Sequence, residues 1–572
     1  MSEVRRVVTD VLVVGSEGAG ARAAISVCEA DPRARVTLTT KGRFTKSGAT
    51  LTAGTDIDVD STSVIELFGL EGDRRDTKDT FLEDIVVEGR YVNNQKLVEV
   101  LVENAPRVVK EVADWGMKVM GVARAAGHRY PRGILSTGVE VMKGLRNKVR
   151  QFGDRVTVME DTLVTDLVVD DAGHVSGATA LDLRTGEPVV FVSKVVLLAT
   201  GGGLRVYPWT SGPEELTGDG HGMAYRIGTR FTDMEFVQFL TCTLEAPPSK
   251  VRSVNPFQLY GGWLLNREGQ RFMARWDPVR MEQSTRDNLA IGIMSEILEG
   301  RGWTDDKGGY VLISMKHLPD QIIDDSPAIQ AWFKKDFIES VKGKAVKCFP
   351  ACHFYCGGIV KNERCETNIP GLLAAGEVCG GVHGANRLSG NAVTEILVDG
   401  AISGVTAAEL VANRDTPRLG KSHYEGLVEK ILAPFNRKEG PSPIQLRKRI
   451  QKLAGYKVGV VRDADLLRQA IAELQDIKAE AAAVAVYNSQ KVYNREWVEA
   501  LQVENMALTL EMIARSALVR QESRGTHYRR DFPKSDNSNW LKNTFLIKNE
   551  EGDMVVTTAP SVITKVRPKE ED

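Results

Sequence analysis

PACHFYCGGIVKNERCETNIPGLLAAGEVCGGVHGANRLSGNAVTE, at residues 350–395, is the stretch around which this chain is organised. His353 and Arg387 stand in it among glycines, and the apolar run at 371–377 predicts a short buried strand that ends in a turn. From Asn391 onward, apolar residues recur at helical spacing. A helix that begins behind a Gly-rich loop presents free backbone N–H groups, which suit an anion or the polar edge of a ring. A Gly-rich connection between core elements is the alternative interpretation.

The N-terminal segment has the pattern of a βαβ unit. Residues 8–15 (VTDVLVVG) form an apolar run that stops at glycine, as a buried parallel strand does. The segment GSEGAGARAA at 15–24 predicts a Gly-rich turn into a helix, and 35–40 predict a second strand. Glu17 stands where a dinucleotide fingerprint has its second glycine, so its carboxylate must point away from a pyrophosphate bound there. Thr40-Lys41 follows the second strand in place of an acidic residue, and a loop of small residues occupies 47–55.

Composition and charge place the chain among globular proteins. Its 572 residues, 42% hydrophobic and 26% charged, imply more than one domain and a large core. A net charge of −2 without a basic block argues against a nucleic-acid binder. No apolar run reaches the roughly 18 residues of a transmembrane segment, and the N-terminus has no signal-peptide pattern. We therefore expect a cytoplasmic protein.

The seven cysteines form no CxxC pair. Cys348, Cys352 and Cys356 are spaced by four, and Cys365 and Cys379 follow farther on, beside apolar residues or glycine. A cluster or zinc site is one interpretation of this group. Buried structural thiols are the other, which we favour, so we assign no metal.

The remaining chain alternates between sheet, helix and an insertion of different composition. Residues 93–120 predict an amphipathic helix capped by Asn93 or Asn94, and 154–200 predict a β-meander that ends at a glycine triplet. Asp219 lies where a helix opens, placed either for a cofactor hydroxyl or as an N-cap. Residues 240–345, richer in aromatic and charged residues, predict an inserted domain, and 462–520 predict a helical bundle. The last fifty residues look irregular, with a strand or two.

These motifs occur in an order that resembles a known family. The motifs are GSEGAGARAA, LLATGGG, TGDGHGMAYRIG, DMEFVQF, STRD, PACHFYCGG, GLLAAGEV, GANRLSGN and ESRGTHYRRDFP, and they cover nearly the whole chain. Together they resemble the flavoprotein subunit of the succinate dehydrogenase and fumarate reductase family, whose relatives include L-aspartate oxidase and enoate reductases. The resemblance implies an α/β fold with a split, Rossmann-like FAD-binding domain, an inserted α+β capping domain and a C-terminal helical domain. The expected ranges are 1–240 and 346–415 for the FAD-binding domain, 241–345 for the capping domain, 416–530 for the helical domain and 531–572 for a C-terminal extension.

The resemblance also implies how FAD is held. Carried over residue by residue, the expected FAD contacts are Gly15, Gly18, Ala19, Gly20, Thr40, Lys41, Ser47, Gly48, Asp219, Glu377, Arg387, Asn391 and Ala392. Members of the family often attach FAD covalently through a histidine in the small-residue loop. Here Gly48 stands at that position and residues 41–55 contain no histidine, so we expect non-covalent FAD.

The family transfers a hydride between flavin N5 and one carbon of a C–C bond and moves a proton at the neighbouring carbon. The resemblance assigns the proton to Arg286, in STRD; a surface ion pair is the alternative. Arginine can serve as an acid only opposite a centre of comparably high pKa. His353 and Arg387 match the pair that clamps one substrate carboxylate, and a bidentate guanidinium beside an imidazole suits that group.

The second carboxylate of a dicarboxylate substrate has no matching ligand. The family places a histidine where this chain has Leu240, and a Thr-Glu pair where Val254 and Asn255 stand. Burying a carboxylate against such residues is costly, so we expect an altered pocket for an enoate, or the corresponding saturated acid, with one carboxylate. One alternative is a fumarate or succinate enzyme that uses Arg124, Arg129 or Arg132 as the missing ligand. Another is a flavin electron-relay subunit without turnover of its own.

No iron–sulfur or haem ligand pattern is visible in the sequence. Electrons must then come from NAD(P)H, a free flavin or another protein of a complex. The resemblance implies an iron–sulfur partner subunit, which would give the complex a peripheral place at the inner face of a membrane. The sequence leaves open the substrate, the physiological direction, the electron donor and the docking face.

Overall fold

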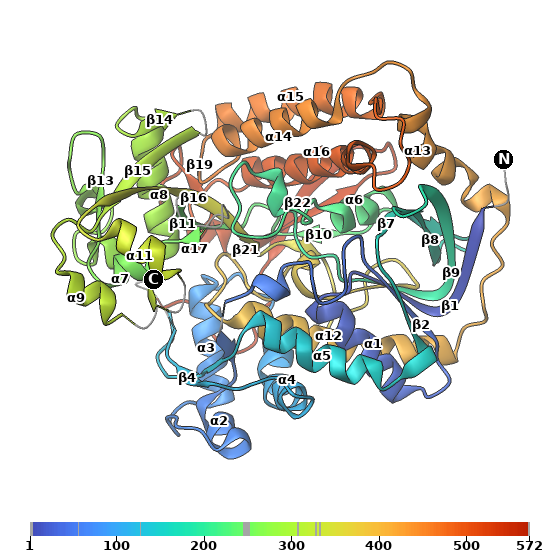
Figure 1. The fold of residues 1–572 in the computed structure, drawn as a ribbon, viewed down its shortest axis with the longest axis horizontal. Helices are drawn as coiled ribbons and strands as arrows, with labels where there is room; N and C mark the ends of the chain where they lie inside the picture. The colour runs from blue at the N-terminus through green and yellow to red at the C-terminus, as the bar shows by residue number, and fades with distance from the viewer. Residues whose placement is uncertain are drawn as a thin grey trace.

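The structure is a computed structural model that describes residues 4–54, 56–125, 127–243, 252–305, 308–326, 329–330 and 333–569. Figure 1 shows a central sheet between two groups of helices, with a separate region at one end that is drawn in green. The α/β fold predicted from the sequence is confirmed.

The central sheet has the strand order β6-β2-β1-β9-β8-β7, and β18 also pairs with β9. Its strands are β1 (Arg5–Val14), β2 (Val36–Thr39), β6 (Val156–Met159), β7 (Thr162–Val169), β8 (Val175–Asp182), β9 (Glu187–Leu198) and β18 (Leu372–Ala374). β7, β8 and β9 form the predicted antiparallel meander. The prediction was wrong for β6, which pairs with β2 in the parallel part of the sheet.

Both faces of this sheet are buried. Successive side chains of a strand point to opposite faces, and in β1 Leu12 and Val14 belong to one core cluster while Val11 and Val13 belong to another. The Val11 cluster contains side chains of α1 (Gly18–Ala30), α4 (Gln95–Asp114), α5 (Gly138–Arg150) and α12 (Asn391–Ala412). The Leu12 cluster contains side chains of α6 (Asp219–Arg226) and of C-terminal helices. Two-sided burial explains the continuous apolar runs that marked these strands in the sequence.

The helix α4 begins as predicted, with Asn94 as its N-cap, but it ends at Asp114 rather than at residue 120. The chain turns at Gly116, whose φ of 105° is left-handed, a conformation that ends helices. Short elements complete this part of the chain: α2 (Ser61–Phe68), α3 (Lys78–Glu88), β3 (Asp56–Asp58), β4 (Gly121–Ala123) and β5 (Gly133–Leu135).

A second region lies between β11 (Val237–Thr243) and β16 (Ala345–Tyr355), which pair with each other. It continues as an antiparallel sheet in the order β12-β11-β16-β15-β13, with β14 on β15, and it has its own apolar core. Its other elements are β12 (Arg252–Ser253), α7 (Asn255–Leu259), β13 (Trp263–Leu265), α8 (Arg286–Leu298), β14 (Trp303–Asp305), β15 (Gly308–Ser314), α9 (Asp320–Asp324) and α11 (Lys335–Val341). We call this the capping region; in Figure 1 it is the green end of the molecule.

C-terminal helices cover the sheet face opposite α1 and α12 (Figure 1). They are α13 (Glu425–Asn436), α14 (Pro443–Lys457), α15 (Ala464–Ala482) and α16 (Arg495–Val519). The predicted helical segment 462–520 corresponds to α15 and α16. After α17 (Asn537–Trp540), the strands β21 (Lys542–Lys548) and β22 (Met554–Pro560) form a hairpin whose first strand pairs with β10 (Phe231–Thr232), and β10 also pairs with β17 (Gly358–Ile359). A last two-stranded pair joins β19 (Val461–Arg462) to β20 (Tyr528–Arg529).

A buried ion-pair cluster joins the C-terminal segment to the turn between β10 and β11, just before the capping region. Arg520 is fully buried and donates to Glu235 at 2.6 Å and to Glu522 at 2.9 Å.

Removing one partner of a buried pair leaves an uncompensated charge. Arg520→Met is therefore expected to lower the free energy of unfolding by about 3–5 kcal/mol, measured by urea denaturation. Arg530→Met is the control, because its ion pair with Asp463 is half exposed and should contribute under about 1 kcal/mol. Equal losses in the two variants would contradict the expected role of burial.

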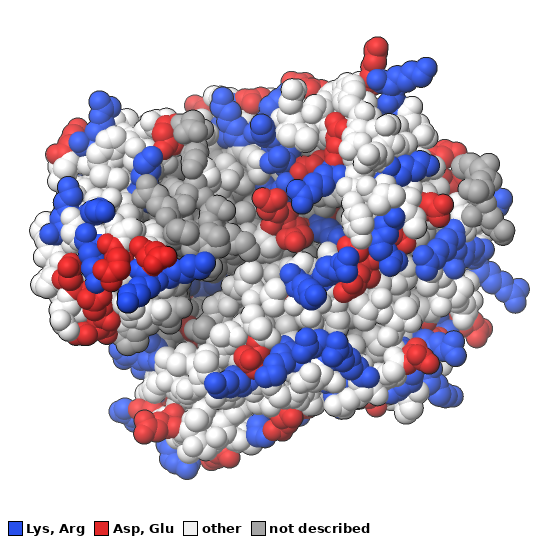
Figure 2. All heavy atoms as spheres, in the orientation of Figure 1, with Lys and Arg blue, Asp and Glu red and all other residues white. Residues whose placement is uncertain are grey.

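The surface mixes charges of both signs. On the face shown in Figure 2, Lys and Arg side chains are interspersed with Asp and Glu.

All seven cysteines are buried, in agreement with the predicted structural thiols. Among the helices that the structure describes, none has the length and apolar character of a membrane-crossing segment.

Candidate cofactor and substrate site

A cavity of about 660 Å³ lies where the parallel strands of the central sheet end. The segments that follow β1, β2, β9 and β18 all contribute to its lining, and so do parts of the capping region. Ligands of open α/β sheets bind at this edge, and the volume is within the roughly 300–1,000 Å³ typical of ligand sites. The cavity therefore extends from a dinucleotide-type crevice to the capping region.

Most residues selected from the sequence line this cavity. They are Gly15, Gly18, Ala19, Thr40, Lys41, Ser47, Gly48, Asp219, Glu377, Arg387, Ala392, Arg286, His353, Leu240 and Asn255. Gly20, Asn391 and Val254 are not among its lining residues. Gly20 lies against the carbonyl of Gly15 and closes the turn, Asn391 is fully buried at the first position of α12, and Val254 packs in the core of the capping region.

The turn between β1 and α1 requires its first glycine. Gly15 has a φ of 105°, and a Cβ there would collide with the carbonyl of Ala199 at the end of β9. The close approach brings the N-terminus of α1 into the cavity, where Gly18 N donates to Thr50 Oγ1 at 3.2 Å. Free N–H groups at a helix N-terminus favour a phosphate.

Asp219 and Lys41, each predicted to contact the cofactor, bind each other. Lys41 Nζ lies 2.6 Å from Asp219 Oδ2, and Gln502 and Asn505 on α16 donate to the same carboxylate. Burial raises the pKa of Asp219, but Lys41 and the two amides outweigh it and hold the pKa below its usual value. The carboxylate therefore stays charged and able to accept a hydroxyl.

Arg286, His353 and Arg387 come together from three parts of the chain. Arg286 is the first residue of α8, His353 lies on β16, and Arg387 lies in the loop before α12. Ser211 Oγ is 2.7 Å from His353 Nδ1. Arg387 donates from Nη2 to Gln238 at 3.1 Å and lies over the Phe354 ring, whereas its Nε is buried without a partner among the described residues.

The electrostatics of these three groups follow from burial and mutual repulsion. Burial, then Arg387 and Arg286, lower the pKa of His353 well below its usual value, so the imidazole is neutral. Burial, then Arg286, lowers the pKa of Arg387 to about 10. Burial also lowers the pKa of Arg286, although Asp56 and Glu88 oppose that shift. A neutral hydrogen-bonding imidazole thus lies beside two cations, an arrangement that suits an anionic ligand.

Comparison with known families decides what this arrangement is. The model of the FAD binding domain matches residues 10–393, and the model of the fumarate reductase flavoprotein C-terminal region matches residues 447–572. This chain belongs to the succinate dehydrogenase and fumarate reductase flavoprotein family. It is an FAD-dependent oxidoreductase of the kind that acts on CH–CH groups.

Relatives within this family resemble the chain over almost its full length. It is 35% identical to an uncharacterized FAD-dependent oxidoreductase of Methanocaldococcus jannaschii, covering 92% of this chain and 94% of that protein. It is 33% identical to one subunit of the fumarate reductase (CoM/CoB) of Methanothermobacter marburgensis, covering 95% and 97%. Among solved structures, Mycobacterium smegmatis Sdh1 superposes with a TM-score of 0.87 at 32% identity over 99% and 96% of the two chains. The fumarate reductase flavoprotein of Escherichia coli gives a TM-score of 0.89 at 26% identity over 99% of both chains.

The cavity of this family member fits FAD. The N-terminus of α1 lines the cavity and would suit a pyrophosphate, Asp219 offers a charged acceptor for a hydroxyl, and the small residues of loop 47–54 leave room for a flat ring. Position 48 carries no side chain through which a flavin could be tethered.

The capping region lines the cavity with Arg286 and His353 and with uncharged side chains. Among the residues that the structure describes, Leu240, Ser253, Asn255 and Phe333 form an uncharged patch of this lining, which we call the capping wall. The three arginines considered as substitutes lie elsewhere. Arg132 is buried against Asp76, Arg129 pairs with Glu83 and Asp84, and Arg124 is exposed.

Sequence reasoning missed several partners in the site. Ser211 and Gln238 hold His353 and Arg387, and Ser389 accepts from Arg286. Gln238 and Ser389 stand inside motifs that were selected from the sequence, DMEFVQF and GANRLSGN, so their positions carried a signal. Ser211 carried none.

Proposed function

We propose that this flavoprotein reduces the double bond of an enoate with one carboxylate, or oxidises the corresponding saturated acid. The neutral capping wall carries the proposal. A second carboxylate placed against Leu240 and Phe333 would lose its hydration, and no described residue of the capping wall offers it a cation. Asn255 can hydrogen-bond a neutral substituent but cannot compensate a charge.

Arg387 and His353 bind the single carboxylate in this proposal. The Arg387 cation has a buried N–H without a partner among the described residues, and Gln238 and the Phe354 ring hold its guanidinium in place. His353 adds a neutral donor whose orientation is fixed by Ser211. Fixing the carboxylate orients the adjacent C–C bond in the cavity.

Arg286 supplies the proton at one of the two carbons. When bound, FAD supplies or accepts the hydride at the other carbon. Arg286 Nη2 donates to Ser389 Oγ at 3.1 Å, and Ser389 Oγ donates to Asp56 Oδ2 at 3.4 Å. Asp56 is partly exposed and also lines the cavity. This hydrogen-bonded series gives Arg286 a route by which its proton is replaced after each turnover.

A partner subunit with an iron–sulfur centre is the electron carrier that we propose. Two observations support a partner. The sequence has no ligand pattern for an iron–sulfur or haem centre, and several relatives are named as subunits, including those of the methanogen fumarate reductase and of bacterial fumarate reductases.

The test is anaerobic reoxidation of the reduced holoprotein by candidate acceptors, followed by flavin absorbance. An aryl acrylate is expected to reoxidise the flavin at least about a hundredfold faster than fumarate, because a dicarboxylate leaves one charge unpaired in the cavity. Faster reoxidation by fumarate would overturn the one-carboxylate proposal and indicate a true fumarate enzyme. No reoxidation by any enoate, with no spectral change on adding a saturated acid, would indicate an electron-relay subunit.

A further inference from the structure

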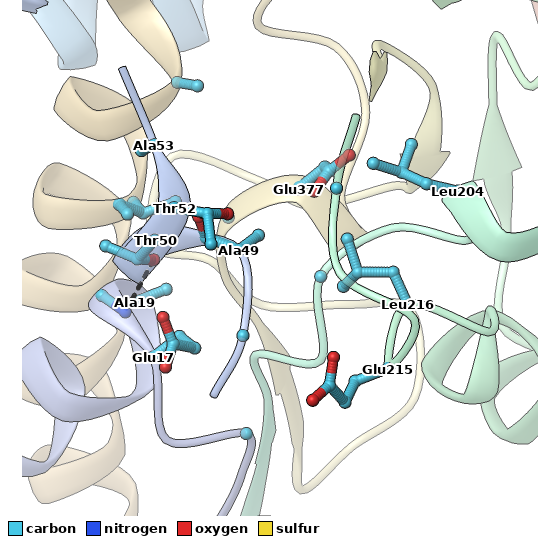
Figure 3. Close-up of a pocket in the computed structure, with 18 of the residues that line it drawn as sticks. Glu17, Ala19, Ala49, Thr50, Thr52, Ala53, Leu204, Glu215, Leu216 and Glu377 are labelled. Atoms are coloured by element: carbon cyan, nitrogen blue, oxygen red, sulfur yellow. Dashed lines mark hydrogen bonds between the residues drawn. The ribbon is translucent and has the colours of Figure 1, made fainter. Parts of the chain in front are cut away.

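Glu17 places a carboxyl group in the cofactor crevice, where a dinucleotide fingerprint has glycine. It occupies the N-cap position of α1, yet its side chain makes no capping hydrogen bond to that helix. Figure 3 shows Glu17 beneath Thr50 and across the pocket from Glu215. The side chain is thus directed toward the loop that follows β2 and away from the helix that it precedes.

Two hydrogen bonds join that loop to the start of α1. Leu51 N donates to Glu17 Oε2 at 3.2 Å, and Gly18 N donates to Thr50 Oγ1 at 3.2 Å. Both partners belong to a single 3₁₀ turn, Thr50–Thr52. Two adjacent residues of the fingerprint, Glu17 and Gly18, therefore hold residues 48–52 through hydrogen bonds.

The Glu17 side chain also fills the space beside Gly48. A Cβ built on Gly48 would lie 2.5 Å from Glu17 Cδ and 2.8 Å from Glu17 Oε1. Real side chains do not approach so closely, so a residue other than glycine at position 48 and a glutamate at position 17 compete for one volume.

We propose that Glu17 is a positioning residue of the FAD site, whose side chain fixes residues 48–52 against the N-terminus of α1 along the cofactor crevice. A cofactor that is held without a covalent bond depends on walls that are ordered before it binds. The proposal concerns FAD retention and does not depend on which acid the enzyme uses.

The charge of Glu17 is compatible with this position. Burial raises the pKa of Glu17 to about 7, the bonds from Leu51 and Thr50 oppose the shift, and Glu215 adds to it. Near neutral pH the group is therefore protonated in a large fraction of molecules and adds less negative charge beside a bound pyrophosphate.

The first test compares Glu17→Gly with Glu17→Gln in the holoprotein. Glycine restores the fingerprint and removes the acceptor for Leu51, whereas glutamine keeps an acceptor of the same length. We expect FAD to dissociate at least about tenfold faster from Glu17→Gly, measured by flavin fluorescence after dilution, and to dissociate from Glu17→Gln within about threefold of the wild-type rate. Hydrogen exchange at the Leu51 amide should accelerate in Glu17→Gly alone.

Glu71→Gln serves as the control, because it removes an exposed carboxylate that does not line the cavity. Exchange at Leu51 should then stay as in the wild type. Unchanged FAD dissociation and unchanged Leu51 exchange in Glu17→Gly would overturn the proposal.

The second test uses competition for the space beside Gly48. Gly48→Ala carries a conformational cost of its own, because its φ is 98°. In the wild-type background the new methyl group also clashes with the Glu17 side chain, and this second cost disappears once that side chain is removed. Gly48→Ala should therefore accelerate FAD release by a larger factor in the wild-type background than in Glu17→Gly. Equal factors in the two backgrounds would show that the side chains do not compete and would overturn the proposed placement, even if one single variant were unstable.

Discussion

Arg286→Gln is expected to lower kcat by about 10²–10⁴-fold, the range for loss of a positioned proton donor, while FAD stays bound. Glutamine keeps part of the polar volume but cannot deliver a proton to a carbon. The structure supports Arg286 as the donor, because it lines the cavity, donates to Ser389, and has a pKa that burial lowers toward a range useful for proton transfer. The measurement is steady-state turnover of the acid that reoxidises the flavin, together with flavin content and the visible spectrum.

Arg280→Gln provides the control for this variant. Arg280 lies six residues earlier in the capping region and is exposed, so turnover should be unchanged. If Arg286→Gln kept more than a tenth of the wild-type kcat, Arg286 would not be the donor. Ser389→Ala is expected to give an intermediate loss with a larger solvent isotope effect, because Arg286 would then regain its proton from less ordered water.

The elements that the sequence predicted best are those fixed by local pattern. β1, β9 and β18 each appear as an apolar run that stops at a glycine or a turn, and the structure brings the three ends to one crevice. Because these strands are parallel, their carboxyl ends meet at the same edge of the sheet. Three apolar patterns that are far apart in the sequence therefore identify one site. The family models and the solved structures confirm the predicted FAD-binding fold and family membership.

The contacts that the sequence could not predict join residues distant along the chain. Lys41 and Asp219 are separated by 178 residues, and Gln502 and Asn505 reach Asp219 from α16. No periodicity encodes such pairs, because they arise only when α16 packs beside the sheet. The same holds for Ser211 and His353, which are separated by 142 residues.

Errors in the prediction had local causes as well. The apolar pattern of α4 continues into Met117, which is buried beyond Gly116 but lies outside the helix, so apolar spacing alone extended the predicted helix too far. Val254 was placed in the pocket together with Asn255, but only Asn255, the first residue of α7, lines the cavity, whereas Val254, the N-cap, packs in the core of the capping region.

Arg387→Gln is expected to lower kcat/KM by about 10²–10⁴-fold, the cost of removing one partner of a buried charged pair. A saturated monocarboxylate that perturbs the flavin spectrum measures the loss directly, as a rise in its dissociation constant. Arg364→Gln is the control, because Arg364 forms a half-exposed ion pair with Glu409 and does not line the cavity. An unchanged dissociation constant in Arg387→Gln would show that the carboxylate binds elsewhere.

The same variant should acquire a dependence on pH that the wild type lacks. After burial, Arg387 is the largest cause of the lowered pKa of His353. With Arg387 gone, burial and Arg286 still lower the pKa of His353, but by less, so acid pH protonates a larger fraction of the imidazole in the site that the guanidinium leaves. A protonated His353 would bind the carboxylate in place of Arg387, so the analogue should bind Arg387→Gln more tightly as the pH falls. In the wild type, His353 stays neutral and binding should vary little over the same range. An analogue affinity in Arg387→Gln that did not increase at acid pH would mean that His353 does not face the carboxylate, and the two-residue clamp would have to be abandoned.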